Sequence, residues 1–315
     1  MRRVIKVLAI VFCVLPVCLG DGLAADKLPV FVSVVPQKYF VQQIGKELVE
    51  VQAMVQPGAS PATYEPRPRQ MADLSKTKIY FAIGVPFENV WLDKIAAANP
   101  EMKVVHTDQG IEKLAMAAHH HDDEKGEHHE GNSDDEKDEY YGKAAHEEDH
   151  HGHAGLDPHI WLSPPLVKIQ ARTVLSVLQE VDPGHRDVYE ANFLEFSAQI
   201  DQLDLDLKKT FAGKTGLQFM VFHPSWGYFA HAYGLKQVPI EIEGKNPKPA
   251  QLKALIEHAR ESGIKVVFVQ PQFSTKSAKL VAREIGGQVA YANPLAEDWM
   301  ANLREVSDKF KAALK

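Results

Sequence analysis

Cysteine is nearly absent from this chain of 315 residues. Cys13 and Cys18 are the two that occur, and both lie in an apolar run near the N-terminus. Residues 19–315 contain no cysteine, so disulfide bonds and thiolate metal ligands are excluded from that part of the chain.

The apolar run belongs to the three-part pattern of a secretory signal peptide. A basic start, MRRVIKV, precedes apolar residues 8–19, and small residues follow at 22, 24 and 25. The run is shorter than the roughly 20 apolar residues that a transmembrane helix needs. We therefore expect residues 1–25 to be removed during soluble export to a bacterial periplasm. Lipid anchoring fits less well, because it needs a cysteine after a small residue and Cys18 follows Val17.

The chain also lacks the motifs of the common enzyme classes. It contains no H-E-x-x-H, no glycine-rich phosphate loop, and no Ser-His-Asp or Cys-His set in a recognisable context. We therefore expect a protein that is not an enzyme. The formal net charge of −7, together with export, disfavours nucleic acid as a partner.

One segment, residues 119–153, has few apolar side chains. It holds nine of the 15 histidines, with thirteen Asp or Glu and three Lys, and so carries a formal charge of −10. Such a composition cannot bury enough apolar surface to offset the entropy of ordering, so we expect a mobile loop over residues 117–156. Histidine-rich tracts indicate metal binding, and we assign this one an auxiliary role in it. Its histidines are His119, His120, His121, His128, His129, His146, His150, His151 and His153.

Outside that segment, short apolar runs alternate with helical patterns. The runs predict strands at residues 28–35, 49–55, 79–83, 103–106, 217–222, 238–242, 264–270 and 289–291. Pro36 is interpreted as the end of the first strand, and one of the helical patterns predicts a helix at residues 249–261. Alternation of this kind predicts βαβ units around mostly parallel sheets. Between the two groups of strands, apolar residues from Tyr189 to Phe211 repeat at steps of three and four, which predicts one long helix. We expect Asp182 to cap this helix and Pro183 to lie in its first turn.

We therefore predict an α/β protein with two βα lobes, joined by one long rigid helix, and a ligand cleft between the lobes. The expected limits are residues 26–181 for the N-terminal lobe, 182–212 for the linking helix and 213–315 for the C-terminal lobe. These limits place the histidine-rich loop as an interruption of the N-terminal lobe.

Four segments at the ends of predicted strands or helices carry a family resemblance. They read GASPATYEPRPRQ at 58–70, DPHIWLSP at 157–164, FHPSWGYFA at 222–230 and ANPLAEDW at 292–299. They resemble the ligand-bearing loops of the zinc- and manganese-binding proteins that serve bacterial ABC importers. The resemblance covers essentially the whole chain after the signal peptide. It implies that a metal is held between two lobes and delivered to a membrane permease.

The resemblance assigns His159 and His223 as the main metal ligands. Two further positions depart from the family pattern. The first loop usually reads Pro-His-x-Tyr-Glu-Pro, and Ala62 stands in place of that histidine. The last loop usually begins Asp-Pro-Leu, and Asn293 stands in place of that aspartate. Two of the four ligands that the family implies therefore remain.

Other side chains are candidates to complete the metal site. A carboxylate would be the best chemical replacement, and we name Glu65 and Glu241 as secondary candidates. The side-chain oxygen of Asn293 is a third. The sequence does not show which of these side chains points into the cleft.

The function that these features favour is capture of a divalent metal by a periplasmic solute-binding protein, for delivery to an ABC permease. Histidine ligands favour Zn²⁺ over Mn²⁺, because manganese prefers oxygen ligands. We expect a monomer. Two alternatives stay open. The same fold could bind a chelated metal or another ligand, since Ala62 and Asn293 replace two usual ligands, or the protein could act as a periplasmic zinc buffer or chaperone.

Overall fold

The computed structural model describes residues 26–116, 155–242 and 244–314. The expected signal peptide and the nine histidines of residues 119–153 lie outside these ranges. Among the helices inside them, none is both long and apolar enough to cross a membrane.

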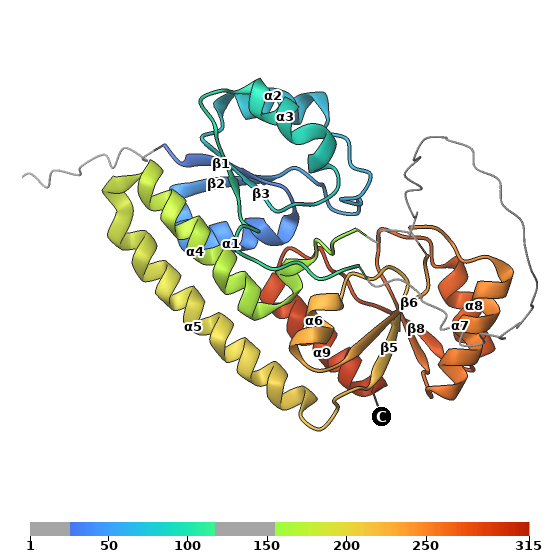
Figure 1. Cartoon of the computed structure of the whole chain (residues 1–315). Helices are drawn as coiled ribbons and strands as arrows, with labels where there is room; N and C mark the ends of the chain where they lie inside the picture. The colour runs from blue at the N-terminus through green and yellow to red at the C-terminus, as the bar shows by residue number, and fades with distance from the viewer. Residues whose placement is uncertain (1–25, 117–154, 243, 315) are drawn as a thin grey trace, which may run out of the picture.

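The N-terminal lobe is built on a parallel sheet with strand order β2-β1-β3-β4 (Figure 1). Its strands are β1 (Leu28–Val32), β2 (Val49–Ala53), β3 (Ile79–Ala82) and β4 (Lys103–His106). Its helices are α1 (Val35–Gly45), α2 (Pro68–Asp73) and α3 (Glu88–Ala98). All four residues of β3 are buried, as expected for a central parallel strand covered on both faces.

The C-terminal lobe repeats this arrangement with strand order β6-β5-β7-β8, again all parallel. Its strands are β5 (Gln218–Val221), β6 (Lys236–Pro239), β7 (Val266–Val269) and β8 (Gln288–Tyr291). Its helices are α6 (Gly227–Ala232), α7 (Pro249–Glu261), α8 (Lys276–Glu284) and α9 (Trp299–Ala313). The predicted α/β fold with two lobes is thereby confirmed.

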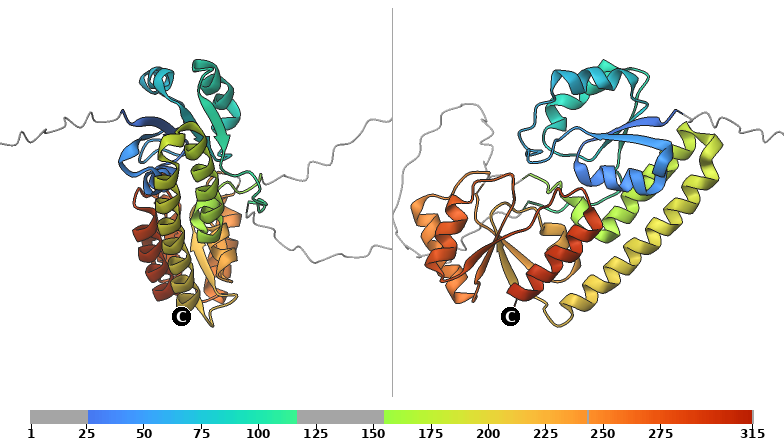
Figure 2. Two further views of the ribbon diagram at one scale, coloured as in Figure 1. Left: turned by 90° about the vertical axis from the view of Figure 1, so that its left-hand side faces the viewer. Right: turned by 180° about the vertical axis from the view of Figure 1, so that it is seen from behind.

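Two long antiparallel helices, α4 (Pro164–Val181) and α5 (Arg186–Phe211), run along both lobes (Figure 2). Lys168 of α4 pairs with Asp201 of α5 at 2.7 Å. Near its start, α5 contacts the N-terminal lobe, where Asn192 donates to the carbonyl oxygen of Ile44 at 2.9 Å. Near its end it contacts the C-terminal lobe, where Tyr233 donates to an oxygen of Asp204 at 3.1 Å. The long helix predicted between the lobes is therefore present, with α4 as its partner.

The start of this helix differs from the expectation. We expected Asp182 and Pro183 to cap it directly, but residues Pro183–His185 form a separate 3₁₀ turn and α5 begins at Arg186. The Asp182 side chain instead accepts one hydrogen bond from the Tyr189 hydroxyl at 2.6 Å and pairs with His185 at 2.8 Å. The Asp182 side chain therefore bonds to the side chains of the following 3₁₀ turn and of the first turn of α5. It does not cap the free backbone N–H groups at the start of the helix.

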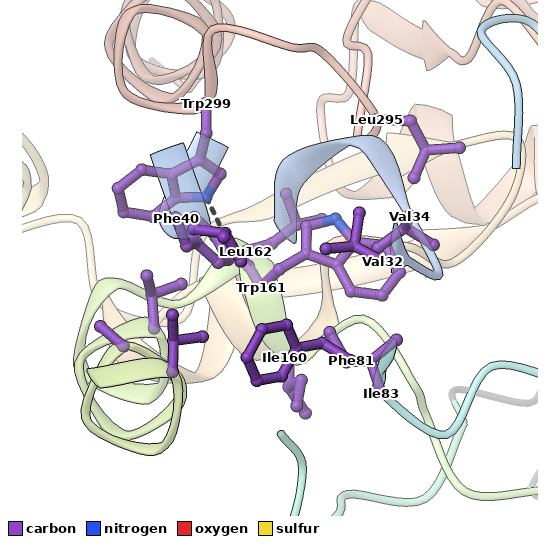
Figure 3. Packing of buried hydrophobic residues seen from close by; sticks show 14 of the residues in the cluster. Val32, Val34, Phe40, Phe81, Ile83, Ile160, Trp161, Leu162, Leu295 and Trp299 are labelled. Atoms are coloured by element: carbon purple, nitrogen blue, oxygen red, sulfur yellow. Dashed lines mark hydrogen bonds between the residues drawn. The ribbon is translucent and has the colours of Figure 1, made fainter. Parts of the chain in front are cut away.

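Buried tryptophans connect the two lobes (Figure 3). The 3₁₀ turn Ile160–Leu162 places Trp161 in the core, where its indole N–H donates to the carbonyl oxygen of Pro294 at 2.7 Å. The indole N–H of Trp299, at the start of α9, donates to the carbonyl oxygen of Trp161 at 2.6 Å. Trp299 also packs edge-on against Phe40 of α1, with ring centres 5.2 Å apart. These contacts fix the residue just before the turn, His159, relative to both lobes.

Candidate metal-binding site

A pocket of about 100 Å³ lies between the two lobes. Its walls come from loops that follow strands of both sheets. Pro86 follows β3, His223 follows β5, Gln272 follows β7 and Pro294 follows β8. Open parallel sheets bind their ligands outside the carboxyl ends of the strands, and the pocket lies at that edge of both sheets.

His159 lines the pocket and is held by Asp157. Oδ1 of Asp157 lies 2.7 Å from Nδ1 of His159 and also accepts from the His159 backbone N–H at 2.9 Å. Tyr228 of α6 fixes this turn, because its hydroxyl donates to the Asp157 carbonyl oxygen at 2.8 Å and accepts from the backbone N–H of Leu114 at 3.0 Å. A Cβ on Gly227 would lie 2.6 Å from the other carboxylate oxygen, so the absence of one lets the carboxylate approach.

His223 is held in the same way from the C-terminal lobe. Strands β5 and β6 pair Val221 with Pro239, so the residues two positions further on, His223 and Glu241, come side by side. Nδ1 of His223 lies 2.6 Å from Oε1 of Glu241. Gln270, just after β7, fixes the backbone: its side chain accepts from the His223 N–H at 3.2 Å and donates to the His223 carbonyl oxygen at 2.6 Å.

The two imidazoles lie close together, with their ring planes at 71° to each other. Their ring centres are 5.3 Å apart, which allows both to reach one ion through zinc–nitrogen bonds of about 2.0–2.1 Å. A carboxylate at Nδ1 favours the tautomer with the proton on that atom, and it leaves Nε2 as the ligand atom. Phe273 stacks on the His223 ring with centres 4.7 Å apart.

The burial of His159 favours its neutral form. This residue is 7% exposed, and burial lowers the pKa of its imidazole below the usual range despite the opposing effect of Asp157. The neutral imidazole is the form that binds metal. The geometry and the electrostatics therefore agree on a metal-binding form.

The other predicted positions lie differently. Ala62 lines the same pocket as the two imidazoles, so the position that the family fills with a histidine has no ligand atom in its side chain here. Glu65 is exposed and does not line the pocket. Its role as a ligand stays a prediction that this geometry does not support.

Glu241 and Asn293 are both engaged with neighbouring groups. Glu241 is buried and supports His223 from behind rather than facing the pocket. The side-chain oxygen of Asn293 accepts from the backbone N–H of Leu295 at 3.0 Å and from the side chain of Gln272 at 3.3 Å. Their roles as direct ligands also stay predictions.

The described residues supply few ligands for one ion. In the ranges that the structure covers, no group of three or more His, Cys, Asp or Glu residues could hold a metal ion. Zinc in proteins prefers four ligands, so a zinc ion bound by His159 and His223 would take its remaining ligands from other groups.

Two contributors to the site were not predicted from the sequence. Gln272 lines the pocket, and its Oε1 atom is buried without a hydrogen-bond partner in the described part of the chain. Met116 also lines the pocket, directly before the histidine-rich segment. The position of Gln272 shortly after β7 is a signal that could have identified it, because ligands collect at that edge of a parallel sheet.

Comparison with known proteins agrees with this fold. Residues 30–313 match the family described as ZnuA, zinc-uptake complex component A periplasmic. The high-affinity zinc uptake system protein ZnuA of Bacillus subtilis (strain 168) is 29% identical over 274 residues, covering 86% of this chain and 79% of that protein. The protein of the same name from Paracoccus denitrificans (strain Pd 1222) is 36% identical over 252 residues, covering 78% and 76%.

Solved structures agree as well. A crystal structure of ZnuA is 40% identical, with a TM-score of 0.79, and the match covers 92% of this chain and 100% of that one. A zinc-bound ZnuA deletion mutant, lacking its residues 138–173, has a TM-score of 0.78 at the same identity. These matches confirm the resemblance that the four loop segments indicate. The chain belongs to the ZnuA family of periplasmic zinc-uptake components.

Proposed function

We propose that this protein captures Zn²⁺ in the pocket between its lobes and delivers it to the permease of an ABC importer, without catalysing a reaction. The observation that carries the proposal is the pair of carboxylate-held imidazoles, His159 and His223, at the carboxyl ends of two parallel sheets. Family membership and the names of the zinc-uptake relatives support the same function. We propose the periplasm as its location and a monomer as its form.

In this proposal the four side chains have two different roles. His159 and His223 are the metal ligands, and Zn²⁺ is preferred over Mn²⁺ because imidazole suits zinc while manganese prefers oxygen ligands. Asp157 and Glu241 are positioning residues that fix the tautomer and the ring orientation. Gln270 and Phe273 hold His223 from its backbone and its ring face.

The histidine-rich segment has an auxiliary role in the proposal. The described residues that flank it, Met116 and Gly155, are joined by a backbone hydrogen bond of 2.9 Å, and Met116 lines the pocket. Metal ions held by residues 119–153 would therefore be tethered close to the pocket. We propose that this segment binds several ions weakly and raises the local metal concentration.

Zinc titration of a protein that lacks residues 1–25 and 119–153 tests the ligand assignment. His159→Ala combined with His223→Ala should abolish one-to-one zinc binding, because both ligand nitrogens are removed. His185→Ala is the matched control, since His185 also pairs with a carboxylate, 2.8 Å from Asp182, but lies outside the pocket. Retained one-to-one binding in the double variant would refute the site.

A further inference from the structure

Two imidazole side chains, those of His159 and His223, line the pocket, and few other lining groups can bind a metal ion. Two imidazoles leave about two positions open on a four-coordinate zinc ion. The wall around them is largely apolar and includes Pro61, Val85 and Leu295. Water molecules on the ion would find few hydrogen-bond partners against such a wall.

Charge points to an anionic partner for the metal. None of the residues that line the pocket is an Asp, Glu, Lys or Arg among those described. Asp157 and Glu241 each lie on the Nδ1 side of an imidazole, one ring away from the ligand nitrogen. A divalent ion here would therefore meet no negatively charged ligand atom from the described chain, and a carboxylate oxygen from outside would be favoured.

Gln272 adds a polar group whose oxygen atom has no hydrogen-bond donor among the described residues. Its side-chain N–H donates to Asn293 Oδ1 at 3.3 Å, which orients the amide. Its Oε1 atom is buried and has no hydrogen-bond partner within the described residues. A buried carbonyl oxygen without a partner is unfavourable, so an N–H donor in the pocket would satisfy it.

We propose that the pocket binds zinc together with one small bidentate ligand of the α-amino acid class. The carboxylate oxygen and the amine nitrogen of this ligand occupy the two open positions on the metal, and a remaining amine N–H donates to Gln272 Oε1. The ligand's carbon skeleton lies against the apolar wall, and the volume of about 100 Å³ has room for such a molecule. This inference rests on the proposed function, and it defines the transported species as a zinc complex.

The experiment measures zinc affinity in the protein without residues 119–153, so that this segment cannot supply the missing ligands. Binding is measured at a series of buffered free Zn²⁺ concentrations. The three arms are zinc alone, zinc with glycine, and zinc with N,N-dimethylglycine. Glycine should tighten zinc binding at least tenfold, and native mass spectrometry should show protein, zinc and glycine together. N,N-dimethylglycine forms the same chelate ring but has no N–H left once it binds, so its effect should be clearly smaller.

Two variants make the test specific. Gln272→Leu should remove the difference between glycine and N,N-dimethylglycine, because the acceptor is lost. Ala62→His should bind zinc tightly without glycine, because a protein ligand then takes one of the open positions. Zinc affinity that is the same with and without glycine, and a complex that contains zinc alone, would overturn the inference and leave the proposed function standing. Absence of zinc binding in every arm would overturn the proposed function itself.

Discussion

At the scale of single residues, the carboxylates behind the imidazoles matter as much as the imidazoles. Asp157→Asn and Glu241→Gln should each weaken zinc binding by about 10–100-fold, because the amide no longer fixes the tautomer that presents Nε2. A competition titration against a zinc chelator measures this. Asp182→Asn is the control, since Asp182 pairs with His185 outside the pocket. Wild-type affinity in the first two variants would show that the carboxylates have no positioning role.

The second prediction at this scale concerns Ala62, where the side chain offers no metal-binding atom. Ala62→His should tighten binding of zinc alone by more than tenfold, that is by more than about 1.4 kcal/mol, because Ala62 lines the same pocket as both imidazoles. Asn293→Asp should add less, since Asn293 does not line it. Thr63→His is the control, because Thr63 is exposed and does not line the pocket. An equal gain in the control would mean that any added histidine binds zinc at this surface.

The sequence identified some of these residues and not others for a physical reason. His159 and His223 stand in loops with distinctive residue sequences, DPHIWLSP and HPSWGYF, so both could be identified from their motifs. Glu241 could be placed at the end of a strand, but its bond to His223 depends on how β5 and β6 pair. Gln272 could be identified only from the tertiary structure. What marks it is a buried side-chain oxygen without a hydrogen-bond partner in the described chain, and no sequence pattern shows this.

At the scale of elements, periodicity predicted most helices and strands. Two element boundaries predicted at prolines were wrong. The strand at residues 103–106 and the helix at 249–261 were predicted with the bounds that the structure shows. Pro36 was interpreted as the end of a strand, but it lies in the first turn of α1, where its missing N–H is no disadvantage. Pro183 was interpreted as the start of the long helix, but it starts a 3₁₀ turn. Proline marks a boundary without showing which element it belongs to.

The contacts between elements give a stability prediction. Trp299→Phe removes the hydrogen bond to the Trp161 carbonyl oxygen and leaves that oxygen buried without its partner. Trp226→Phe is the matched control, because Trp226 is equally buried and its indole N–H has no partner in the described chain. Trp299→Phe should therefore lower the unfolding free energy by about 1–3 kcal/mol more than Trp226→Phe, as measured by urea denaturation. Equal losses would mean that the bond contributes nothing beyond packing.

At the scale of the whole molecule, alternation of strands and helices predicted two lobes, and the long apolar stripe predicted the helix along them. What the sequence could not give is how the lobes meet. Lys38 pairs with Glu297 at 2.6 Å across the lobes, and Trp161 donates to Pro294, in each case across more than a hundred residues of chain. Such contacts carry no local pattern, since each partner is an ordinary surface or core residue in its own segment. The pocket between the lobes depends on them.

The last prediction concerns the histidine-rich segment, whose composition sets it apart from the rest of the chain. Deleting residues 119–153 should leave the thermal stability of the metal-free protein nearly unchanged, because a segment with so few apolar residues adds little to a core.

The deletion should lower the number of zinc ions bound. It should also slow zinc capture at low ionic strength, because it removes a formal charge of −10 that attracts cations towards the pocket. Added salt should shrink the difference in rate, since it screens this attraction. Stopped-flow zinc uptake and native mass spectrometry of both proteins measure rate and stoichiometry. Equal stoichiometry, with equal rates at every salt concentration, would mean that these nine histidines and thirteen acidic residues serve neither capture nor storage.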